Sequence, residues 1–320
     1  MSISELLLTI AIPTYNRSKY LKETLDSFIS IILNEGNKKC EIFVSDNCSS
    51  DNTKQVLEEY SQKYSFIRYQ INEQNVGFDK NVLLVLNNSK GKYIWLFGDD
   101  DLPVKGSVKN VLYIIGQYDP VYIFLNFGSY TQDLKKKISN MSQKIKEDQW
   151  PLASDKALKN IGLNMSLLGS NVINRKCYAD LEDMEKYCNT VIVHIFIVLA
   201  LMRMGNVYIS MKEYIMKRAG DTPIDVDAFV RGIRQSVDFA NELGYPKKYT
   251  KKIINNFLID SFIAGLKIGA NGGDTGAYLG IYYKYFKKYL LFWILIIPLQ
   301  IIPNSLLRVC KTFKDKVIRN

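Results

Sequence analysis

The sequence predicts an α/β protein with a mostly parallel sheet and helices on both of its faces, followed by a mainly helical C-terminal region. In the first half, short apolar runs of strand length alternate with segments whose apolar residues recur at helical spacing. This alternation is typical of a parallel sheet wrapped by helices. Helical spacing dominates the second half. With 320 residues, 47% of them hydrophobic, the chain can bury a large core.

The first element is expected to be a strand, because residues 6–12 form a continuous apolar run. Ser18 then opens a helix whose apolar residues are three and four positions apart. The pattern repeats along the chain. Further strands are expected at 41–45, 66–71, 93–97 and 121–125, and further helices from Thr53 through Tyr60, at 79–86 and at 108–115.

Residues 129–159 are rich in Lys, Gln and Ser without a clear period, which predicts a loop or mobile segment. Later helices are expected at 190–204, around the chain's only histidine, His194, and at 225–241 and 251–268. Three regions follow from these boundaries: a ligand-binding half at 1–128, a region with the loop and the apolar helix at 129–222, and a helical region at 223–320.

The net charge of +10 is concentrated near the end of the chain, where eight cations and one anion follow from Lys284 onward. Charge alone does not distinguish a nucleic acid, an anionic membrane or a phosphate-bearing substrate. The five cysteines are widely spaced without a C-x-x-C pair, which argues against a disulfide framework or a zinc site and favours a reducing cytoplasm. The apolar N-terminus has no basic leader and is expected to be the first strand.

Three successive carboxylates, Asp99, Asp100 and Asp101, follow Gly98 at the end of an expected strand. Hard oxygen ligands in such a group suit Mg²⁺ or Mn²⁺ that carries a diphosphate. An acidic turn that caps the next helix is the alternative for an isolated run of this kind. Ligands bind beyond the carboxyl ends of the strands in parallel sheets, so the turns after residues 12, 45 and 97 should gather at one edge.

Four further motifs precede the three aspartates in the sequence, at 13–17 (PTYNR), 44–47 (VSDN), 75–81 (NVGFDKN) and 91–93 (GKY). In their order and spacing they resemble glycosyltransferase family 2, over about residues 6–112. The resemblance implies a GT-A fold, with the donor half at 1–128 and the acceptor side at 129–222. His194 in its apolar helix is similar to a histidine in a subgroup of bacterial O-antigen and capsule sugar transferases.

The resemblance also implies roles for single residues. Pro13, Thr14 and Tyr15, with Asn16 beside them, resemble the loop that lies against the nucleotide base and ribose, and Asp46 resembles the carboxylate that binds the base. Asn75, Gly77 and Lys80 resemble the segment that lines the donor pocket. Asp99 and Asp101 resemble the pair that touches ribose and metal, and Asp100 can replace either. Helix caps at Thr14, Asn16 and Asp46, and a simple turn at Gly77, are the structural alternatives.

An inverting transfer is implied, in which an acceptor hydroxyl attacks the anomeric carbon while a base takes its proton. Glu182 and Asp183 match the carboxylate pair of the family in form, and His194 is the rival base, although a lone histidine on an apolar face is more often a core residue. Lys217 and Arg218 suit a diphosphate of the donor or acceptor, and an ordinary basic loop is the equal alternative.

The apolar run at 290–302 contains Pro298 and is too short to span a bilayer, which takes roughly twenty residues. Its tyrosines, Trp293 and flanking cations favour a peripheral position on the anionic inner face of the cell membrane. A polyprenyl-diphosphate-linked glycan is then the expected acceptor. A buried core helix or a dimer contact is the alternative, and homo-oligomerisation stays open.

Two other functions compete with the transferase. A sugar nucleotidyltransferase would need a Gly-rich phosphate loop after the first strand, and a sugar-nucleotide dehydrogenase would need G-x-G-x-x-G there; residues 13–16 provide neither. A noncatalytic membrane or nucleic-acid binder would interleave its cations with exposed aromatic residues, whereas here the cations gather beside one apolar tail. We therefore expect no nucleic-acid partner.

Overall fold

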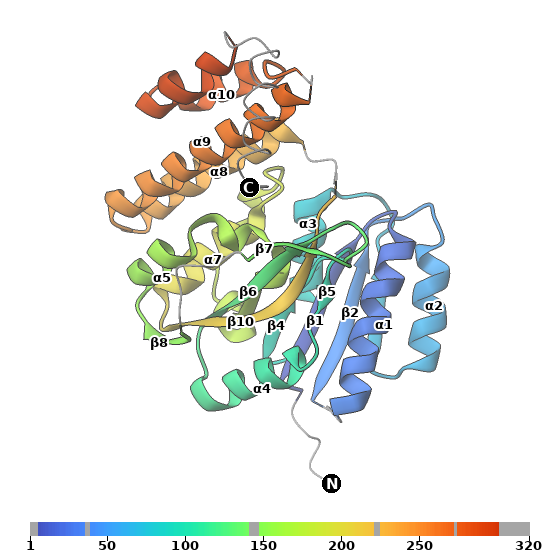
Figure 1. Cartoon of the computed structure of the whole chain (residues 1–320). Helices are drawn as coiled ribbons and strands as arrows, with labels where there is room; N and C mark the ends of the chain where they lie inside the picture. The colour runs from blue at the N-terminus through green and yellow to red at the C-terminus, as the bar shows by residue number, and fades with distance from the viewer. Residues whose placement is uncertain (1–5, 36–38, 141–146, 221–224, 272–273, 301–320) are drawn as a thin grey trace, which may run out of the picture. The chain divides into compact units, whose positions relative to one another are not determined.

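The computed structural model describes residues 6–35, 39–140, 147–220, 225–271 and 274–300. The chain forms two compact units, Met1–Pro223 and Ile224–Asn320. The first unit is built on a single large sheet and the second is helical (Figure 1).

The sheet of the first unit has ten strands in the order β3-β2-β1-β4-β9-β6-β10-β5, with β7 paired to β6 and β8 paired to β10. Neighbours among β1 to β4 are parallel, as is the pair of β6 and β10. The central strand β9 is antiparallel to both β4 and β6, which makes the sheet mixed. The strands are β1 Leu8–Thr14, β2 Cys40–Asp46, β3 Ile67–Ile71, β4 Tyr93–Leu96, β5 Leu102–Pro103, β6 Tyr122–Tyr130, β7 Lys137–Asn140, β8 Gln149–Leu152, β9 Asn171–Asn174 and β10 Val207–Arg218.

Helices cover both faces of the sheet (Figure 1). Alternate residues after Tyr93 point to opposite faces: Trp95 and Phe97 pack edge-on against Phe28 of α1, whereas Ile94 and Leu96 join the core beneath α3 and α7. The helices of this unit are α1 Ser18–Glu35, α2 Thr53–Lys63, α3 Phe78–Asn87, α4 Ser107–Tyr118, α5 Ser154–Ile161, α6 Arg175–Ala179 and α7 Val193–Arg203. The short 3-10 turns are η1 Gly162–Ser166, η2 Leu168–Ser170 and η3 Met184–Tyr187.

The expectation of a loop across 129–159 was wrong over much of its length. β6 continues to Tyr130, β7 and β8 add to the sheet, and α5 buries Ala157, Leu158 and Ile161. β7 and β8 have four residues each and α5 has eight, so none of them leaves a period long enough to detect in the sequence. Residues 141–146 of the expected segment lie outside the described residues.

The second unit consists of α8 Val226–Glu242, α9 Lys247–Ala270, α10 Leu279–Phe286, a π-helical turn η4 Phe292–Ile296 and a 3-10 turn η5 Pro298–Gln300. α8 and α9 pack against each other, and α10 and η4 pack on them. In the part of the chain that the structure describes, no helix is long and apolar enough to cross a membrane. The end of the expected apolar run, at 301–302, and the basic residues after it lie outside the described residues.

Candidate functional site

The loops after β1, β2 and β4 meet at one edge of the sheet, as the parallel arrangement requires. The Thr14 hydroxyl donates to Asp99 Oδ2 at 2.7 Å. The Asn16 amide donates to Ser49 Oγ, also at 2.7 Å, and Asn16 Oδ1 accepts from the Ser50 amide. Asn16 has a positive φ of 52°, which turns the chain between the strand and α1. Hydrogen bonds that involve their own side chains therefore join the turns after β1, β2 and β4.

The aspartate turn, Asp99–Asp101, is held by hydrogen bonds from α1, and Arg17 offsets part of its negative charge. Thr24 of α1 donates to the backbone carbonyls of Asp99 and Asp101 at 3.0 and 2.8 Å. Arg17 Nη1 lies 3.2 Å from Asp99 Oδ1 and 2.6 Å from Asp100 Oδ2. Asp99 and Asp101 are buried, whereas Asp100 is partly exposed.

Burial dominates the electrostatics of this turn. It raises the pKa of Asp99 to about 6, and the nearby charge of Asp100 acts in the same direction, while Arg17 opposes both. The pKa of Asp101 is also raised, by burial first and by Asp100 next. Buried carboxylates with raised pKa values are short of positive charge, which is the condition that a bound cation relieves.

Gly98 leaves room for two of these carboxylates to converge. A Cβ atom on this residue would lie 3.3 Å from Asp100 Oδ1 and 3.4 Å from Asp101 Oδ2. Oxygen donors of this kind fit Mg²⁺ or Mn²⁺. The described residues contain no group of three or more His, Cys, Asp or Glu side chains arranged to hold a metal ion. A cation at Asp99–Asp101 would therefore complete its shell with water and substrate phosphate, which is the usual arrangement for Mg²⁺.

Arg218, one of the two basic residues that suit a diphosphate, makes several contacts within the protein. Its side chain is only 8% exposed. The guanidinium donates to the carbonyls of Asp100 and Gln132 and to Glu23, and it stacks on Tyr20. Its backbone amide donates to Asp101 Oδ1. The guanidinium is thus engaged with three groups of the protein, whereas the cation next to it in the sequence is exposed.

Lys217, the residue before Arg218 on β10, is exposed. Its charge acts to lower the pKa of the Asp101 carboxyl, so the ammonium lies within electrostatic reach of the aspartate turn. Alternation along a strand sends successive side chains to opposite faces. Because Lys217 and Arg218 are consecutive residues of β10, their side chains point to opposite faces. A reader of the sequence could infer this difference only after recognising β10 as a strand.

Asp46, the carboxylate expected at the nucleotide base, lies at the end of β2. It is fully buried and accepts hydrogen bonds from the backbone and hydroxyl groups of Ser49, and burial raises its pKa. Its neighbour Asn47 faces the next loop instead: its amide nitrogen donates to Asn75 Oδ1, and its oxygen accepts from the amide of Val76. Asn47 is also buried, at 3% exposed, so the side chains of both residues bond within the protein and connect the turn after β2 to its neighbours.

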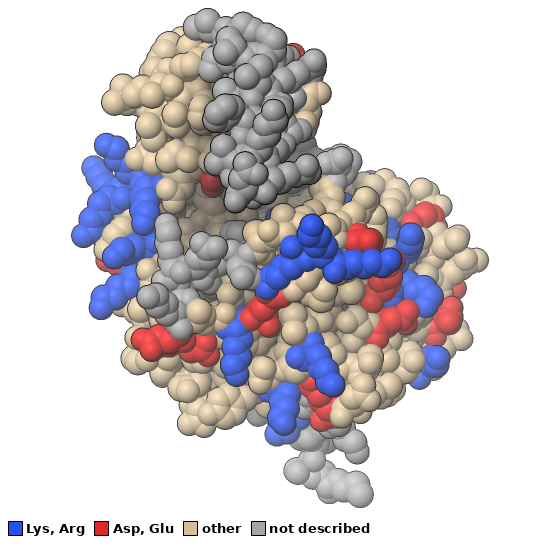
Figure 2. Space-filling view, viewed as in Figure 1, with Lys and Arg blue, Asp and Glu red and all other residues tan. Residues whose placement is uncertain are grey.

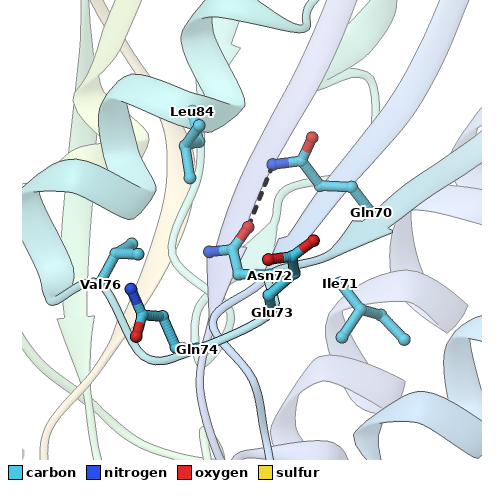
Figure 3. Close-up of a pocket in the computed structure, with 7 residues that line it drawn as sticks. All are labelled: Gln70, Ile71, Asn72, Glu73, Gln74, Val76 and Leu84. Atoms are coloured by element: carbon cyan, nitrogen blue, oxygen red, sulfur yellow. Dashed lines mark hydrogen bonds between the residues drawn. The ribbon is translucent and has the colours of Figure 1, made fainter.

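The loop between β3 and α3 carries Asn75 and Gly77, and Lys80 lies in the first turn of α3; all three residues are exposed. Gly77 has φ 84°, a conformation that favours glycine, and its amide donates to Asn75 Oδ1. A hollow of about 390 Å³ opens beside this loop (Figure 3). The residues that line it are Gln70, Ile71, Asn72, Glu73, Gln74, Val76 and Leu84, so the three motif residues lie next to the hollow and not in its wall.

Asp79, in the first turn of α3, connects the motif at 75–81 to the backbone before α7. Its carboxylate accepts hydrogen bonds from the amides of Thr190, Val191 and Val193 at 2.7, 2.8 and 3.0 Å. Val191 has φ 56°, which is rare for a β-branched residue. The helix expected from residue 190 accordingly begins at Val193, because Asp79 holds the preceding backbone in a non-helical turn.

The three candidate bases are not equivalent. Glu182 and Asp183 are exposed in the segment before η3. His194 is 1% exposed, its Nε2 lies 2.9 Å from the carbonyl of Ser166, and its Nδ1 has no hydrogen-bond partner among the described residues. Burial lowers the pKa of His194. This environment is that of a buried core histidine, whereas both carboxylates are exposed.

Two residues of the motif at 13–17 differ in exposure: Pro13 is buried in β1, and Tyr15 is 44% exposed. Tyr15 thus offers an aromatic ring to a ligand at the edge of the sheet, beside the joined turns. Its exposure is the kind that a base-stacking side chain needs.

Comparison with known proteins identifies the sequence family. A model described as glycosyl transferase family 2 matches residues 9–168. The abequosyltransferase RfbV of Salmonella typhimurium is 38% identical over 104 residues, which are 32% of this chain and 31% of that protein. The GalNAc(5)-diNAcBac-PP-undecaprenol beta-1,3-glucosyltransferase of Campylobacter jejuni is 30% identical over 106 residues, 33% of each chain. The chain thus spans about a third of the length of these relatives.

Among solved structures, TarS 1–349 of S. aureus in complex with UDP matches with a TM-score of 0.61 at 20% identity, over 79% of this chain and 70% of that one. At this identity the likeness concerns the fold. The GT-A fold expected from the sequence is confirmed, and so is the helical C-terminal region that follows it.

Proposed function

Because the chain belongs to glycosyl transferase family 2, we propose that it transfers a sugar from a nucleotide-diphosphate donor to a hydroxyl group of a glycan in bacterial surface polysaccharide synthesis. The observation that supports this most directly is the hydrogen bond that the Thr14 hydroxyl donates to the Asp99 carboxylate. It joins the turn expected to hold the nucleoside to the carboxylates expected to hold the diphosphate cation, so that one ligand can touch both.

The donor is assigned to the region 1–128. Tyr15, Asn16 and Asn75 are exposed on the joined turns and are proposed to present an aromatic ring and amide groups to a nucleoside, while Asn47 is buried and connects two of these turns through Asn75. Gly77 lets the backbone come close to the ligand, since it has no side chain. Asp46 acts behind them by closing the turn after β2.

Asp99 and Asp101, with Asp100 beside them, are proposed to hold Mn²⁺ or Mg²⁺. Such a cation, when bound, offsets the negative charge of the leaving diphosphate. Lys217 supplies a second positive charge on the exposed side of the turn. Arg17 stabilises the carboxylates, because it lies within hydrogen-bond distance of both Asp99 and Asp100.

The transfer is proposed to be inverting, with the acceptor in the region 129–222. Glu182 and Asp183 remain the candidates for the general base, because both are exposed and able to meet a hydroxyl group. The segment that follows them is held at the donor-side loop through Asp79.

A polyprenyl-diphosphate-linked glycan is the proposed acceptor. The name of the Campylobacter jejuni relative contains such a lipid, and the basic, apolar end of this chain suits an anionic membrane surface. We place the protein at the cytoplasmic face of the membrane for the same reasons.

Thermal unfolding with a panel of nucleoside diphosphates, each with and without Mn²⁺, tests the donor site. A ligand at about a hundred times its dissociation constant adds roughly 2.7 kcal/mol to the free energy of unfolding. We expect one nucleotide to stabilise the natural chain in a Mn²⁺-dependent way and to have no such effect on Asp101→Ala. If no nucleotide stabilises the natural chain, the proposal fails.

A further inference from the structure

The second unit carries exposed apolar side chains where a soluble helix surface would be polar. Leu290 is 73% exposed, Ile294 53%, Trp293 48% and Tyr283 45%. Together with Lys287 these residues form what we call the 283–294 patch. Scattered exposed apolar residues are ordinary, but a contiguous group marks an interaction surface.

Contacts within the patch show that it is contiguous. The ring centroids of Tyr283 and Trp293 are 6.2 Å apart, and Lys287 Nζ lies 5.3 Å from the centre of the Tyr283 ring. Trp293 Nε1 donates to the carbonyl of Lys287 at 2.8 Å. Leu290 and Ile294 are four residues apart, a spacing that places them on one side of a helical turn.

The opposite side of the same segment already has its packing partners. Phe292 is fully buried and Ile296 is 5% exposed, and η4 contacts α9 and α10. The segment is therefore anchored by its inner side chains, while its outer apolar side chains face solvent. Packing among the described residues of this unit does not explain why the apolar side chains of Leu290, Trp293 and Ile294 are exposed.

The charge around the patch distinguishes between possible partners. Lys287 is exposed within the patch, and Lys284 and Lys288 are exposed beside it. The sequence has no Asp or Glu from 275 to 300, and Asp227 of α8 lies 3.5 Å from Lys284, so Lys287 and Lys288 carry the argument. A second copy of the chain would bring like charges together across a symmetric interface, which is unfavourable. An anionic lipid surface complements the lysines, and a tryptophan beside apolar residues suits the boundary between headgroups and acyl chains.

We propose that the 283–294 patch is the surface by which the protein lies on an anionic membrane, with Leu290, Trp293 and Ile294 in the headgroup and acyl boundary and Lys287 and Lys288 against lipid phosphates. The inference rests on the proposed function in that a membrane-bound acceptor requires such a surface. It assigns that role to named residues of the second unit.

Vesicle sedimentation of the full chain tests the apolar side chains. Natural protein should bind phosphatidylcholine vesicles that contain phosphatidylglycerol, and the double variant Leu290→Asp, Ile294→Asp should bind about tenfold or more weakly, since it places two charges in the apolar boundary. Leu33→Asp is a matched control, because Leu33 on α1 is 57% exposed and lies outside the patch.

The charge is tested by Lys287→Glu with Lys288→Glu, which should also weaken binding about tenfold or more, in a salt-dependent way. Lys247→Glu with Lys248→Glu makes the same change of charge in the same unit, at the start of α9, where cations gather over one end of the unit (Figure 2). If both lysine pairs weaken binding equally, the net charge and not the patch is responsible, and the proposal is wrong.

Insertion is read from Trp293, because Trp95 is fully buried and Trp150 is partly buried. Brominated lipids should quench the fluorescence of the natural protein, and Trp293→Phe should still bind vesicles but lose the quenching. Absence of vesicle binding by the natural chain, or self-association that Leu290→Asp abolishes, would overturn the proposal. Nucleotide stabilisation, measured on every variant, reports on the proposed function separately: it should persist in patch variants, and its absence in a chain that binds vesicles would reject the donor site alone.

Discussion

The backbone amide of Arg218 donates a hydrogen bond of 2.9 Å to the Asp101 carboxylate, which lies 117 residues earlier in the chain. The guanidinium of the same residue donates to the carbonyl of Asp100 at 2.8 Å. The aspartate turn after β4 is therefore held by Arg218 of β10 as well as by Thr14 of β1. The position of the proposed metal ligands depends on a strand that the motif-bearing half of the sequence does not contain.

Replacement of the two adjacent basic residues should separate structure from ligand binding. Arg218→Met should lower the free energy of unfolding by about 1–3 kcal/mol, because it leaves the carbonyls of Asp100 and Gln132 and the Glu23 carboxylate without their donor. Lys217→Met should change stability by less than about 0.5 kcal/mol and weaken nucleoside diphosphate binding about tenfold. Urea unfolding and calorimetric titration measure the two effects. Equal loss of stability in both variants would contradict the assignment.

Asp101→Asn should stabilise the protein in the absence of ligand. The asparagine keeps an oxygen for the Arg218 amide but removes a buried charge. Because the folded-state pKa of Asp101 is raised, the wild-type carboxylate costs nothing below its unfolded pKa, near 3.9, and destabilises the fold as pH rises through the folded value. The variant should therefore gain about 1 kcal/mol or more above neutral pH and little near pH 4.

With Mn²⁺ and the correct nucleotide, the order of these two proteins should reverse, because only the natural chain gains binding free energy. Melting temperatures across pH, with and without ligand, give both comparisons. A variant that is less stable than the natural chain at all pH values would show that the carboxylate is structural.

Asp79→Asn should loosen the connection between the donor-side loop and α7. An asparagine side chain has one acceptor oxygen, whereas the carboxylate uses both oxygens to hold three amides, so at least one buried amide loses its partner. We expect a loss of about 1–3 kcal/mol and faster hydrogen exchange at 190–193. Asp26→Asn on the surface of α1 is the control. Unchanged exchange at 190–193 would contradict the clamp.

The donor half could be predicted well because its motifs occupy consecutive strand ends. The turns after β1, β2 and β4 meet as expected, since parallel strands place their carboxyl ends at the same edge. Within a turn, however, neighbouring polar residues point in different directions. Asp46 turns inward to Ser49 while Asn47 faces Asn75, and only the backbone geometry decides between them.

The acceptor side was harder to predict because its elements are short and depend on the sheet for their form. β7 and β8 each span four residues and are strands only through their pairing with β6 and β10. The difference in burial between Lys217 and Arg218 has the same origin: the side-chain direction follows from β10, which the sequence pattern did not reveal.

His194 provides the last prediction, because it is the chain's only histidine. Burial lowers its pKa in the folded state, so the unfolded chain binds a proton more readily once pH falls below about 6.5. The stability that the neutral imidazole contributes is complete above that pH and is lost as pH falls towards the folded pKa, at up to about 1.4 kcal/mol per pH unit.

His194→Gln keeps a donor for the Ser166 carbonyl and does not titrate, so the difference in unfolding free energy between the natural chain and this variant should slope between about pH 6.5 and 5 and be flat above. The imidazole NMR signals of the folded protein should not shift near pH 6.5. A native-state titration near 6.5 would mean that solvent reaches His194, and its place among the candidate bases would have to be restored.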